Sequence, residues 1–337
     1  MTQPPLDLSG KTVLVTGGTG TIGSAIVERL LASDVSGVRI FSRDESKQFD
    51  LRQKLPKDER LRFLIGDTRD LERLRRALEG VGVVFHAAAM KHVFASEYNP
   101  FEAVKTNIVG TQNVIDAAMD EGVERVLFAS SDKAVNPTST MGASKLMAEK
   151  LISAANLFRG VHPTIFASVR FGNVVGSRGS VLPLFLEQVA NGGPLTITDR
   201  RMTRFIMLID NAVDLMFQAL ALAHGGEVFV LKMPAIRIED LAQLLVEATD
   251  IVIEEIGMQA GEKHAEELLT DEELARAMET DDMYIVQPQI SVLHPDRDES
   301  YPDARPATSK SSSDTAVPLT PDELRELLVA AKVIERR

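Results

Sequence analysis

The segment SSDKAVNPTSTMGASK, residues 130–145, combines side chains that could carry out proton transfer. Asp132 and Lys133 are adjacent in it and are expected at the end of a core strand, where a carboxyl group and an amine could face a ligand. Lys145 follows Met141 by four residues, so the two side chains would lie on the same face of a helix. A solvated Asp–Lys pair is the alternative, but such a pair is more often found on a helix or an outer loop. The segment therefore predicts acid–base chemistry at Asp132 and Lys133.

The elements that would position these residues follow a regular pattern. From Lys11 onward, short apolar runs alternate with longer amphipathic stretches, which is typical of parallel strands connected by helices. We expect six strands, in residues 11–17, 37–43, 61–67, 82–89, 125–132 and 165–173. The pattern predicts an α/β fold with a doubly wound parallel sheet of the Rossmann type. Ligands of such a sheet bind beyond the carboxyl ends of the strands, where Asp132 and Lys133 are expected.

A glycine-rich loop, VTGGTGTIG, lies between the first strand and the helix that follows it. Glycine is needed there because the backbone must turn sharply and approach a pyrophosphate, which sits on the helix N-terminus. An ordinary glycine-rich turn is the alternative, but the position at the first strand–helix junction favours a dinucleotide. The cofactor contacts expected in this loop are Gly17, Thr19, Gly20, Thr21 and Ile22.

The end of the second strand indicates which dinucleotide is bound. Ser42 and Arg43 stand where an NAD site favours an acidic group, and a guanidinium suits a 2′-phosphate. We therefore predict NADP, although Asp44 leaves a solvated Arg–Asp pair as an alternative. Asp67 is a plausible adenine contact or, equally, a helix N-cap. The other cofactor contacts are expected at Lys47, Thr68, Ala87, Ala88, Ala89 and Lys145.

The composition excludes several classes of function. The net charge of -12 argues against a surface for nucleic acid or an anionic membrane. The absence of cysteine excludes disulfides, thiolate nucleophiles and cysteine-based metal sites, and the six histidines lack metal-ligand spacing, so we expect no metal. No apolar run approaches the roughly 20 residues of a membrane span, and MTQPPLDLSGK lacks the pattern of a signal peptide. We expect a cytoplasmic protein.

The chain is expected to have three parts. Residues 1–175 would form the NADP-binding domain. Residues 176–290, where the strand–helix alternation is lost, would form most of a smaller α/β lobe that binds substrate. Residues 291–337 would be a coil rich in Pro, Ser and Asp, followed by a C-terminal helix beginning at Thr320.

Motifs along nearly the whole chain carry a family resemblance. In order they are FSRDE, HAAAMKHVFASEYNP, KTNIVGTQNV, SSDKAVNPT, RFGNVVGSRGSVLPLF, MTRFIM and GEKHAEELLT. The chain resembles the extended short-chain dehydrogenase/reductases, and among them the UDP-N-acetylglucosamine 4,6-dehydratases of polysaccharide biosynthesis. Longer relatives carry membrane-spanning segments. No such segment is expected in this sequence, so the resemblance is to the soluble branch. It implies a UDP-sugar substrate and a homo-oligomer, either a dimer or a hexamer.

The resemblance also implies a reaction cycle. A hydride passes from C4 of the sugar to NADP⁺, water is lost from C5 and C6, and the hydride returns to C6. Asp132 would protonate the departing hydroxyl and Lys133 would take the C5 proton, for which the pKa of Lys133 must fall by about 3 units. Part of the family has Met where other members have the catalytic Tyr, so Met141 need not signal a lost activity. Ser131, or Lys133 acting twice, would relay the C4 hydroxyl proton, and Lys145 would bond the nicotinamide ribose.

Substrate contacts are implied by the same resemblance. They are Lys91, Asn173, Arg178, Ser180, Val181, Arg204 and Glu262. Taken alone, Arg204 could equally form a surface salt bridge, and His92 is more plausibly structural than a general acid. Two other functions stay open. A UDP-sugar 4-epimerase would share the fold, the cofactor and the C4 oxidation, whereas a non-catalytic NADP-binding regulator would be consistent with the loss of the tyrosine.

Overall fold

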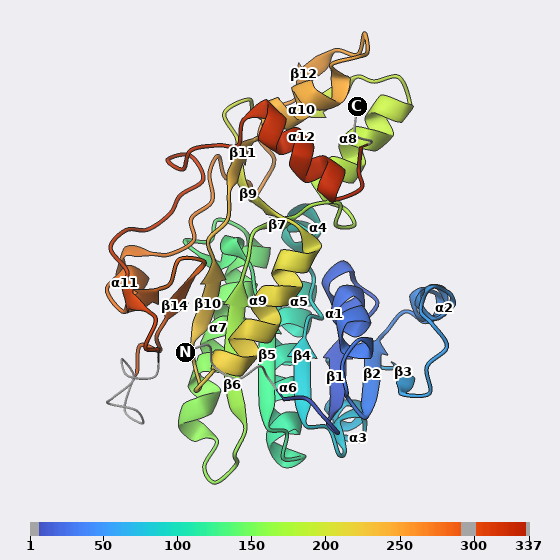
Figure 1. Ribbon diagram of the computed structural model, residues 1–337, viewed down its shortest axis with the longest axis vertical. Helices are drawn as coiled ribbons and strands as arrows, with labels where there is room; N and C mark the ends of the chain where they lie inside the picture. The colour runs from blue at the N-terminus through green and yellow to red at the C-terminus, as the bar shows by residue number, and fades with distance from the viewer. Residues whose placement is uncertain (1–6, 291–300, 335–337) are drawn as a thin grey trace.

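A ten-stranded sheet forms the centre of the computed structural model, which describes residues 7–290 and 301–334 (Figure 1). Its strands are β1 Thr12–Thr16, β2 Gly37–Ser42, β3 Leu61–Ile65, β4 Val83–His86, β5 Arg125–Ala129, β6 Ile165–Arg170, β10 Val228–Leu231, β13 Ala277–Glu279, β14 Met283–Val286 and β15 Arg305–Pro306. Their order is β15-β13-β14-β10-β6-β5-β4-β1-β2-β3. The pairs from β10 through β6, β5, β4, β1 and β2 to β3 are parallel, whereas those involving β13, β14 and β15 are antiparallel.

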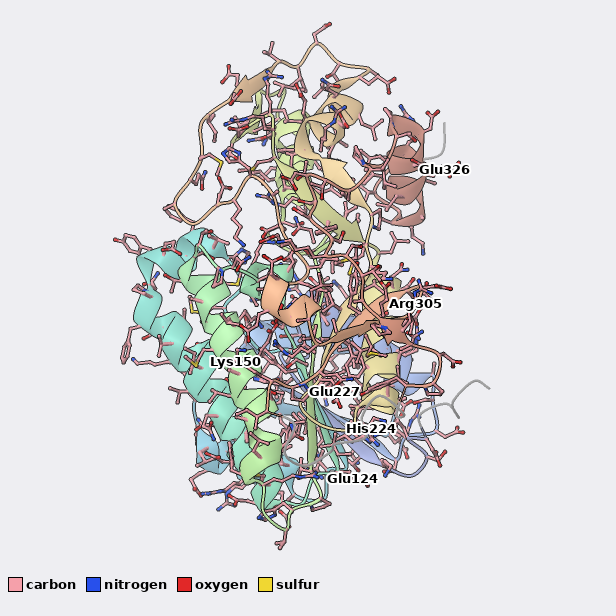
Figure 2. The ribbon with its side chains drawn as sticks, turned by 90° about the vertical axis from the view of Figure 1, so that its left-hand side faces the viewer. Glu124, Lys150, His224, Glu227, Arg305 and Glu326 are labelled. Carbon is pink, nitrogen blue, oxygen red and sulfur yellow. The ribbon has the colours of Figure 1, made fainter. Side chains whose placement is uncertain are left out.

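Helices cover both faces of this sheet. They are α1 Thr21–Leu31, α2 Glu45–Lys54, α3 Leu71–Leu78, α4 Val93–Tyr98, α5 Pro100–Ala103, η1 Val104–Val109, α6 Gly110–Asp120, η2 Asp132–Ala134, α7 Thr140–Phe158 and α9 Ile209–Leu222. On one face α1 and α9 contact each other, and on the other face α6 contacts α3 and α7. Figure 2 shows α7 and α9 on opposite sides of the sheet. The predicted doubly wound α/β fold is confirmed.

The six predicted strands are confirmed as β1 to β6. Their apolar runs are continuous because both faces of the sheet are covered. Every residue of β4 is buried, and so are four of the five residues of β5. Two separate apolar clusters result, one beneath each helical layer, with Ile26 and Met216 in the first and Val114 and Ile152 in the second.

A smaller lobe lies beyond the carboxyl ends of the strands, at the top of Figure 1. It contains the sheet β11-β9-β7 and the pair β12-β8, with helices around them. The elements are β7 Asn173–Val174, α8 Val181–Ala190, β8 Leu195–Ile197, β9 Thr203–Met207, β11 Ala235–Arg237, α10 Ile238–Val246, β12 Ile253–Glu255 and α12 Pro321–Ala330. Thr320 and Glu323 form a capping box on α12, so the predicted start of the C-terminal helix is confirmed.

The division of the chain between the two parts differs from the expected boundaries. Within 176–290, the large sheet contains β10, β13 and β14, and α9 packs against one of its faces. A short helix, α11 Asp271–Leu274, precedes β13. Beyond 291, α12 packs in the smaller lobe through Leu324 and Leu328. The reason is that short apolar runs such as VFVL and MYIV pair with strands remote in sequence, which local patterns do not encode. Part of the expected coil, 291–300, lies outside the described residues.

Candidate active site

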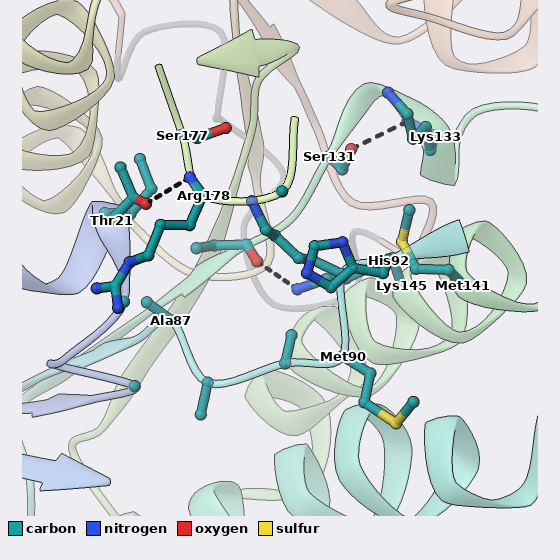
Figure 3. A pocket seen from close by; sticks show the side chains of 18 of the residues that line it. Thr21, Ala87, Met90, His92, Ser131, Lys133, Met141, Lys145, Ser177 and Arg178 are labelled. Carbon is teal, nitrogen blue, oxygen red and sulfur yellow. Dashed lines mark hydrogen bonds between the residues drawn. The ribbon is translucent and has the colours of Figure 1, made fainter. Parts of the chain in front are cut away.

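A cavity of about 780 Å³ opens at the carboxyl ends of the strands, between the large sheet and the smaller lobe (Figure 3). With one exception, the residues predicted from the sequence to touch cofactor or substrate line this cavity. The exception is Asp132, which is fully buried in the layer beneath the wall. Segments widely separated in the chain therefore meet at one site. Among the described residues, no group of three acidic or histidine side chains could hold a metal ion.

The glycine-rich loop packs closely against the loop that follows β4. Gly17 has a φ of +64°, and a Cβ there would lie 2.7 Å from the backbone nitrogen of Ala88. Gly20 is the N-cap residue of α1 and has no side chain to bond the first free N–H groups of that helix. Those groups and the positive end of the helix dipole are therefore available to an anion. The local shape fits a dinucleotide pyrophosphate.

The adenosine end of the cavity is bordered by charged side chains from two strand ends. The Arg43 guanidinium lies 3.6 Å from an Asp67 oxygen, and Arg69 donates to the same carboxylate at 2.6 Å. Burial disfavours the charged form of Asp67, but its hydrogen bonds with Arg69 and the charge of Arg43 keep its pKa below the usual value. The cap of α3 is Asp70, so the expectation that Asp67 could be a helix N-cap is wrong.

Asp44 does not form the solvated pair with Arg43 considered from the sequence. Its carboxylate caps α2 by accepting from the backbone N–H of Lys47 at 3.0 Å, and it also pairs with the Lys47 ammonium at 3.0 Å. Ser42 accepts a hydrogen bond from the buried Gln48 at 3.1 Å. Arg43 is thus left with a half-exposed guanidinium facing the cavity.

Asp132 and Lys133 form a close pair directly after β5. Lys133 Nζ lies 3.1 Å from Asp132 Oδ1, and Ser131 Oγ donates to the same oxygen at 2.8 Å. Asp132 Oδ2 is buried and has no hydrogen-bond partner among the residues that the structure describes. The backbone N–H of Asp132 donates to the Phe171 carbonyl, which fixes the start of η2 against the end of β6. The predicted acid–base neighbours are therefore in direct contact.

Lys133 is surrounded by acceptors. In addition to Asp132, its ammonium lies 3.1 Å from Asn173 Oδ1 and 3.4 Å from Glu266 Oε1. Burial lowers the pKa of Lys133, but the negative charges of Asp132 and Glu266 outweigh this effect and the net pKa is raised. The reaction expected from the sequence requires that the pKa of Lys133 falls by about 3 units. In this structure the pKa is instead raised, because the charges of Asp132 and Glu266 outweigh burial.

The start of α7 positions Met141 at the cavity. Ser139 caps the helix by accepting from the Gly142 N–H at 3.1 Å. The Glu97 carboxylate, from α4, accepts a hydrogen bond from the Thr140 N–H at 2.5 Å and so stabilises the first turn of α7. Met141 is almost fully buried yet lines the cavity. The thioether provides an apolar wall and no exchangeable proton.

Lys145 lies one turn further along α7, on the cavity side as predicted. Its ammonium donates to the Ala129 carbonyl at 2.8 Å and lies 4.5 Å from the centroid of the Phe128 ring. Burial lowers the pKa of Lys145 to about 8, although the charge of Glu149 opposes the change. A lysine held in this way has little freedom to move and presents a fixed donor to the cavity.

The arginines expected on the substrate side already have partners. Arg178 donates from its backbone N–H to Thr21 Oγ1 at 3.3 Å, and its guanidinium donates to the Thr19 carbonyl, so it lies on the glycine loop (Figure 3). Arg204 donates to the carbonyls of Thr203 and Lys263 at 2.7 and 2.9 Å. The alternative of a surface salt bridge for Arg204 is therefore wrong.

The remaining substrate-side residues come from three segments. Ser180 is the N-cap residue of α8, and its hydroxyl donates to the Ser177 carbonyl at 2.7 Å. Val181 begins the same helix. Glu262 accepts from the backbone N–H of Gln259 at 2.8 Å. Burial lowers the pKa of Lys91, and the charge of Arg178 adds to this effect. These side chains all border the cavity.

Among the cavity residues that were not predicted from the sequence are two charged ones, Lys263 and Glu266. Lys263 donates to the Val135 carbonyl at 2.7 Å and lies 3.5 Å from Glu266 Oε2. Both belong to the motif GEKHAEELL, in which only Glu262 was assigned a role. The segment is not helical, so helical spacing could not indicate which of its side chains face the site.

Comparison with known proteins identifies the family. Residues 13–288 match the family model described as polysaccharide biosynthesis protein. The chain belongs to this family. It is 52% identical over 287 residues to an uncharacterized membrane protein of Methanocaldococcus jannaschii, covering 82% of this chain and 86% of the relative. It is 45% identical to a UDP-glucose 4-epimerase of Rickettsia conorii, covering 81% and 82%, and 42% identical to an inverting UDP-N-acetylglucosamine 4,6-dehydratase of Campylobacter jejuni, covering 86% of each.

Solved structures agree with this assignment. Pen from Bacillus thuringiensis superposes with a TM-score of 0.92 at 43% identity, covering 98% of this chain and 100% of that one. DesIV, a dTDP-glucose 4,6-dehydratase from Streptomyces venezuelae solved with NAD, gives a TM-score of 0.69 at 26% identity, covering 75% and 86%. The resemblance to extended short-chain dehydrogenase/reductases is confirmed, and the chain is an enzyme of their nucleotide-sugar dehydratase and epimerase group. No helix in the described part of the chain is long and apolar enough to cross a membrane.

Proposed function

We propose that this enzyme is an NADP-dependent UDP-N-acetylglucosamine 4,6-dehydratase that forms a UDP-4-keto-6-deoxy-N-acetylhexosamine. The observation that carries the proposal is the contact between Lys133, which lines the cavity together with Met141, and Asp132, which lies 3.1 Å from it directly beneath the cavity wall. Loss of water from C5 and C6 requires a base for the C5 proton and an acid for the departing hydroxyl. A 4-epimerase requires no such pair, because its proton and hydride transfers both occur at C4.

The dinucleotide would lie along the glycine loop, with its pyrophosphate at the N-terminus of α1. When bound, it supplies the acceptor for the C4 hydride and returns that hydride to C6. The guanidinium of Arg43 supports NADP over NAD, because it is half-exposed at the adenosine end and the nearby Asp44 is engaged with Lys47. Lys145 would donate to the nicotinamide ribose from its fixed position. The structural neighbour DesIV, which binds NAD, supports a nicotinamide dinucleotide in general.

Ser131 supports a route for the C4 hydroxyl proton that does not need a tyrosine. Its hydroxyl borders the cavity and donates to Asp132 Oδ1 at 2.8 Å. A proton taken from the C4 hydroxyl could pass through Ser131 to Asp132, and Asp132 would then hold the proton that the departing C6 hydroxyl requires. The C4 proton would leave in the water molecule. Lys133 would first release one proton of its ammonium to solvent and would then take the C5 proton. Because its N–H groups exchange with solvent, it would deliver a solvent-derived proton back to C5.

Self-association is also proposed. Phe94, Tyr98 and Phe101, on α4 and α5, are 64%, 81% and 65% exposed, which supports a contact with a second copy of the chain. Light scattering after gel filtration would test this. A monomer at all concentrations would contradict the proposal.

The reaction is tested by NMR of the purified protein incubated with UDP-N-acetylglucosamine in deuterated water. A C6 methyl signal with deuterium at C5 is the expected result. The relatives named UDP-glucose 4-epimerase favour a second candidate, and appearance of the C4 epimer alone would establish it in place of the dehydratase. A protein that binds NADP and alters neither this sugar nucleotide nor UDP-glucose would contradict both.

A further inference from the structure

Glu266 is a buried carboxylate at the active site to which nothing above assigns a role. It is 2% exposed and lines the cavity. Its Oε1 lies 3.4 Å from Lys133 Nζ and its Oε2 lies 3.5 Å from Lys263 Nζ, so one carboxylate is shared by two lysines. A buried carboxylate is costly unless it is paired, which indicates that its position between these cations has a purpose.

Three groups surround the Lys133 ammonium. Asp132 Oδ1 and Asn173 Oδ1 accept hydrogen bonds from it at 3.1 Å, and Glu266 Oε1 forms an ion pair with it at 3.4 Å. An ammonium has three N–H donors, whereas a neutral amine has two N–H donors and a lone pair. When Lys133 gives up one proton, its two remaining N–H groups can keep the hydrogen bonds to Asp132 and Asn173, and Glu266 remains the third group beside the nitrogen.

We propose that Glu266 is a positioning residue that, as a buried carboxylate shared with Lys263, holds the Lys133 amine at the C5 side of the substrate. The inference rests on the proposed function in one respect, that Lys133 acts on C5. Glu266 also belongs to the segment that contains Glu262, the expected ribose contact, so the part of the chain that borders the substrate also holds the base.

Several charged groups influence the titration of Lys133. Asp132 comes from its own segment, Glu266 and Lys263 from residues 257–270, and Arg204 from β9. The negative charges favour the ammonium, whereas the positive charge of Arg204 disfavours it. Removal of the Glu266 charge alone should therefore make Lys133 easier to deprotonate.

The variant Glu266→Gln tests the proposal, because it keeps the shape of the side chain and removes its charge. The backbone N–H and carbonyl of Glu266 bond Ser313 and are unaffected by the change. Glu267→Gln is the matched control, since Glu267 is the next residue and pairs instead with Asn136 and Lys310. The unfolding temperature and the affinity for NADP should be alike in the wild type, Glu266→Gln and Glu267→Gln. A difference in either quantity would reveal a folding defect.

The first measurement does not depend on turnover. The pH dependence of Lys133 acetylation by a water-soluble reagent is followed by peptide mass spectrometry. In Glu266→Gln the midpoint should fall by at least about 1 pH unit, so that labelling below the midpoint is about tenfold faster, whereas Glu267→Gln should match the wild type. Equal midpoints in all three proteins would overturn the proposal.

The second measurement is the dehydration of UDP-N-acetylglucosamine. For Glu266→Gln we expect kcat to fall at least about tenfold while KM stays within about threefold, and the acidic limb of the pH profile to move to lower pH. Wild-type kinetics at every pH would overturn the role of Glu266. If the wild type forms no dehydrated product, the proposed function fails, and the labelling experiment still decides whether Glu266 controls Lys133.

Discussion

Lys145 should make the folded protein less stable at neutral pH than at alkaline pH. Its ammonium is buried against the Ala129 carbonyl and the Phe128 ring, and burial lowers its pKa from 10.5 to about 8. Between these two values the unfolded chain binds more protons than the folded protein, and stability rises with pH wherever this is true. The penalty is therefore fully present below pH 8 and disappears as the pH rises through 10.5.

The size of the effect follows from the change in pKa. A change of about 2.5 at 1.36 kcal/mol for each unit gives a penalty of about 3 kcal/mol at pH 7. At pH 9.5 the folded lysine has lost its proton, and about 1 kcal/mol of the penalty remains. Between pH 7 and 9.5 the contribution of Lys145 should therefore become about 2 kcal/mol less unfavourable.

Urea unfolding of the wild type and of Lys145→Met over this pH range measures the effect. Methionine retains most of the apolar stem without the charge, and the titration of all other groups cancels in the difference between the two proteins. The advantage of Lys145→Met in free energy of unfolding should shrink by about 2 kcal/mol from pH 7 to 9.5. Lys150→Met, an exposed change on the same helix, should show no such trend. Parallel curves for the wild type and Lys145→Met would refute the reasoning.

Three further predictions concern the site. Asp132→Asn should lower dehydration by about 10²- to 10⁴-fold and should also suppress the absorbance of the reduced nicotinamide, because the amide can neither accept the C4 hydroxyl proton through Ser131 nor protonate the departing hydroxyl. Turnover within tenfold of wild type would contradict its role. Arg43→Ala should weaken the affinity for NADP, measured by calorimetry, by at least about tenfold and leave the affinity for NAD within about threefold of the wild-type value. An equal loss of affinity for both dinucleotides would argue against a 2′-phosphate contact. Gly17 has a φ of +64°, and a Cβ there would lie 2.7 Å from Ala88. Gly17→Ala should therefore abolish dinucleotide binding and lower the free energy of unfolding by about 1–2 kcal/mol. Unchanged affinity would contradict the close approach of the loop.

Local patterns in the sequence were sufficient for six of the ten strands of the large sheet and for much of the cavity. The apolar runs of β1 to β6 predict strands because both faces of the sheet are covered, and the carboxyl ends of parallel strands meet at one edge. Asp132 and Lys133 could therefore be placed near Gly17, although more than a hundred residues separate them. The four-residue spacing of Met141 and Lys145 was likewise enough to place both side chains at the cavity.

Features that depend on contacts remote in sequence could not be predicted in this way. The return of the chain to the large sheet through β10 and β14 depends on pairing with β6, and the motif VFVL is equally suited to a strand of the smaller lobe. The pKa of Lys133 was misjudged for the same reason. Its direction is set by the charges of Asp132 and Glu266 together, and Glu266 comes from an irregular segment without helical or strand periodicity.

The two carboxylates beside Lys133 differ in their second partner, and this difference assigns their roles. If both remained charged, Lys133 would stay an ammonium and could not act as a base. Asp132 can be neutralised, because Ser131 Oγ lies 2.8 Å from it and can deliver a proton. Glu266 instead lies 3.5 Å from the ammonium of Lys263. Protonation of Asp132 would remove one of the two charges that retain the Lys133 proton and would create the acid that elimination needs. Oxidation at C4 would thereby prepare both members of the pair for the loss of water.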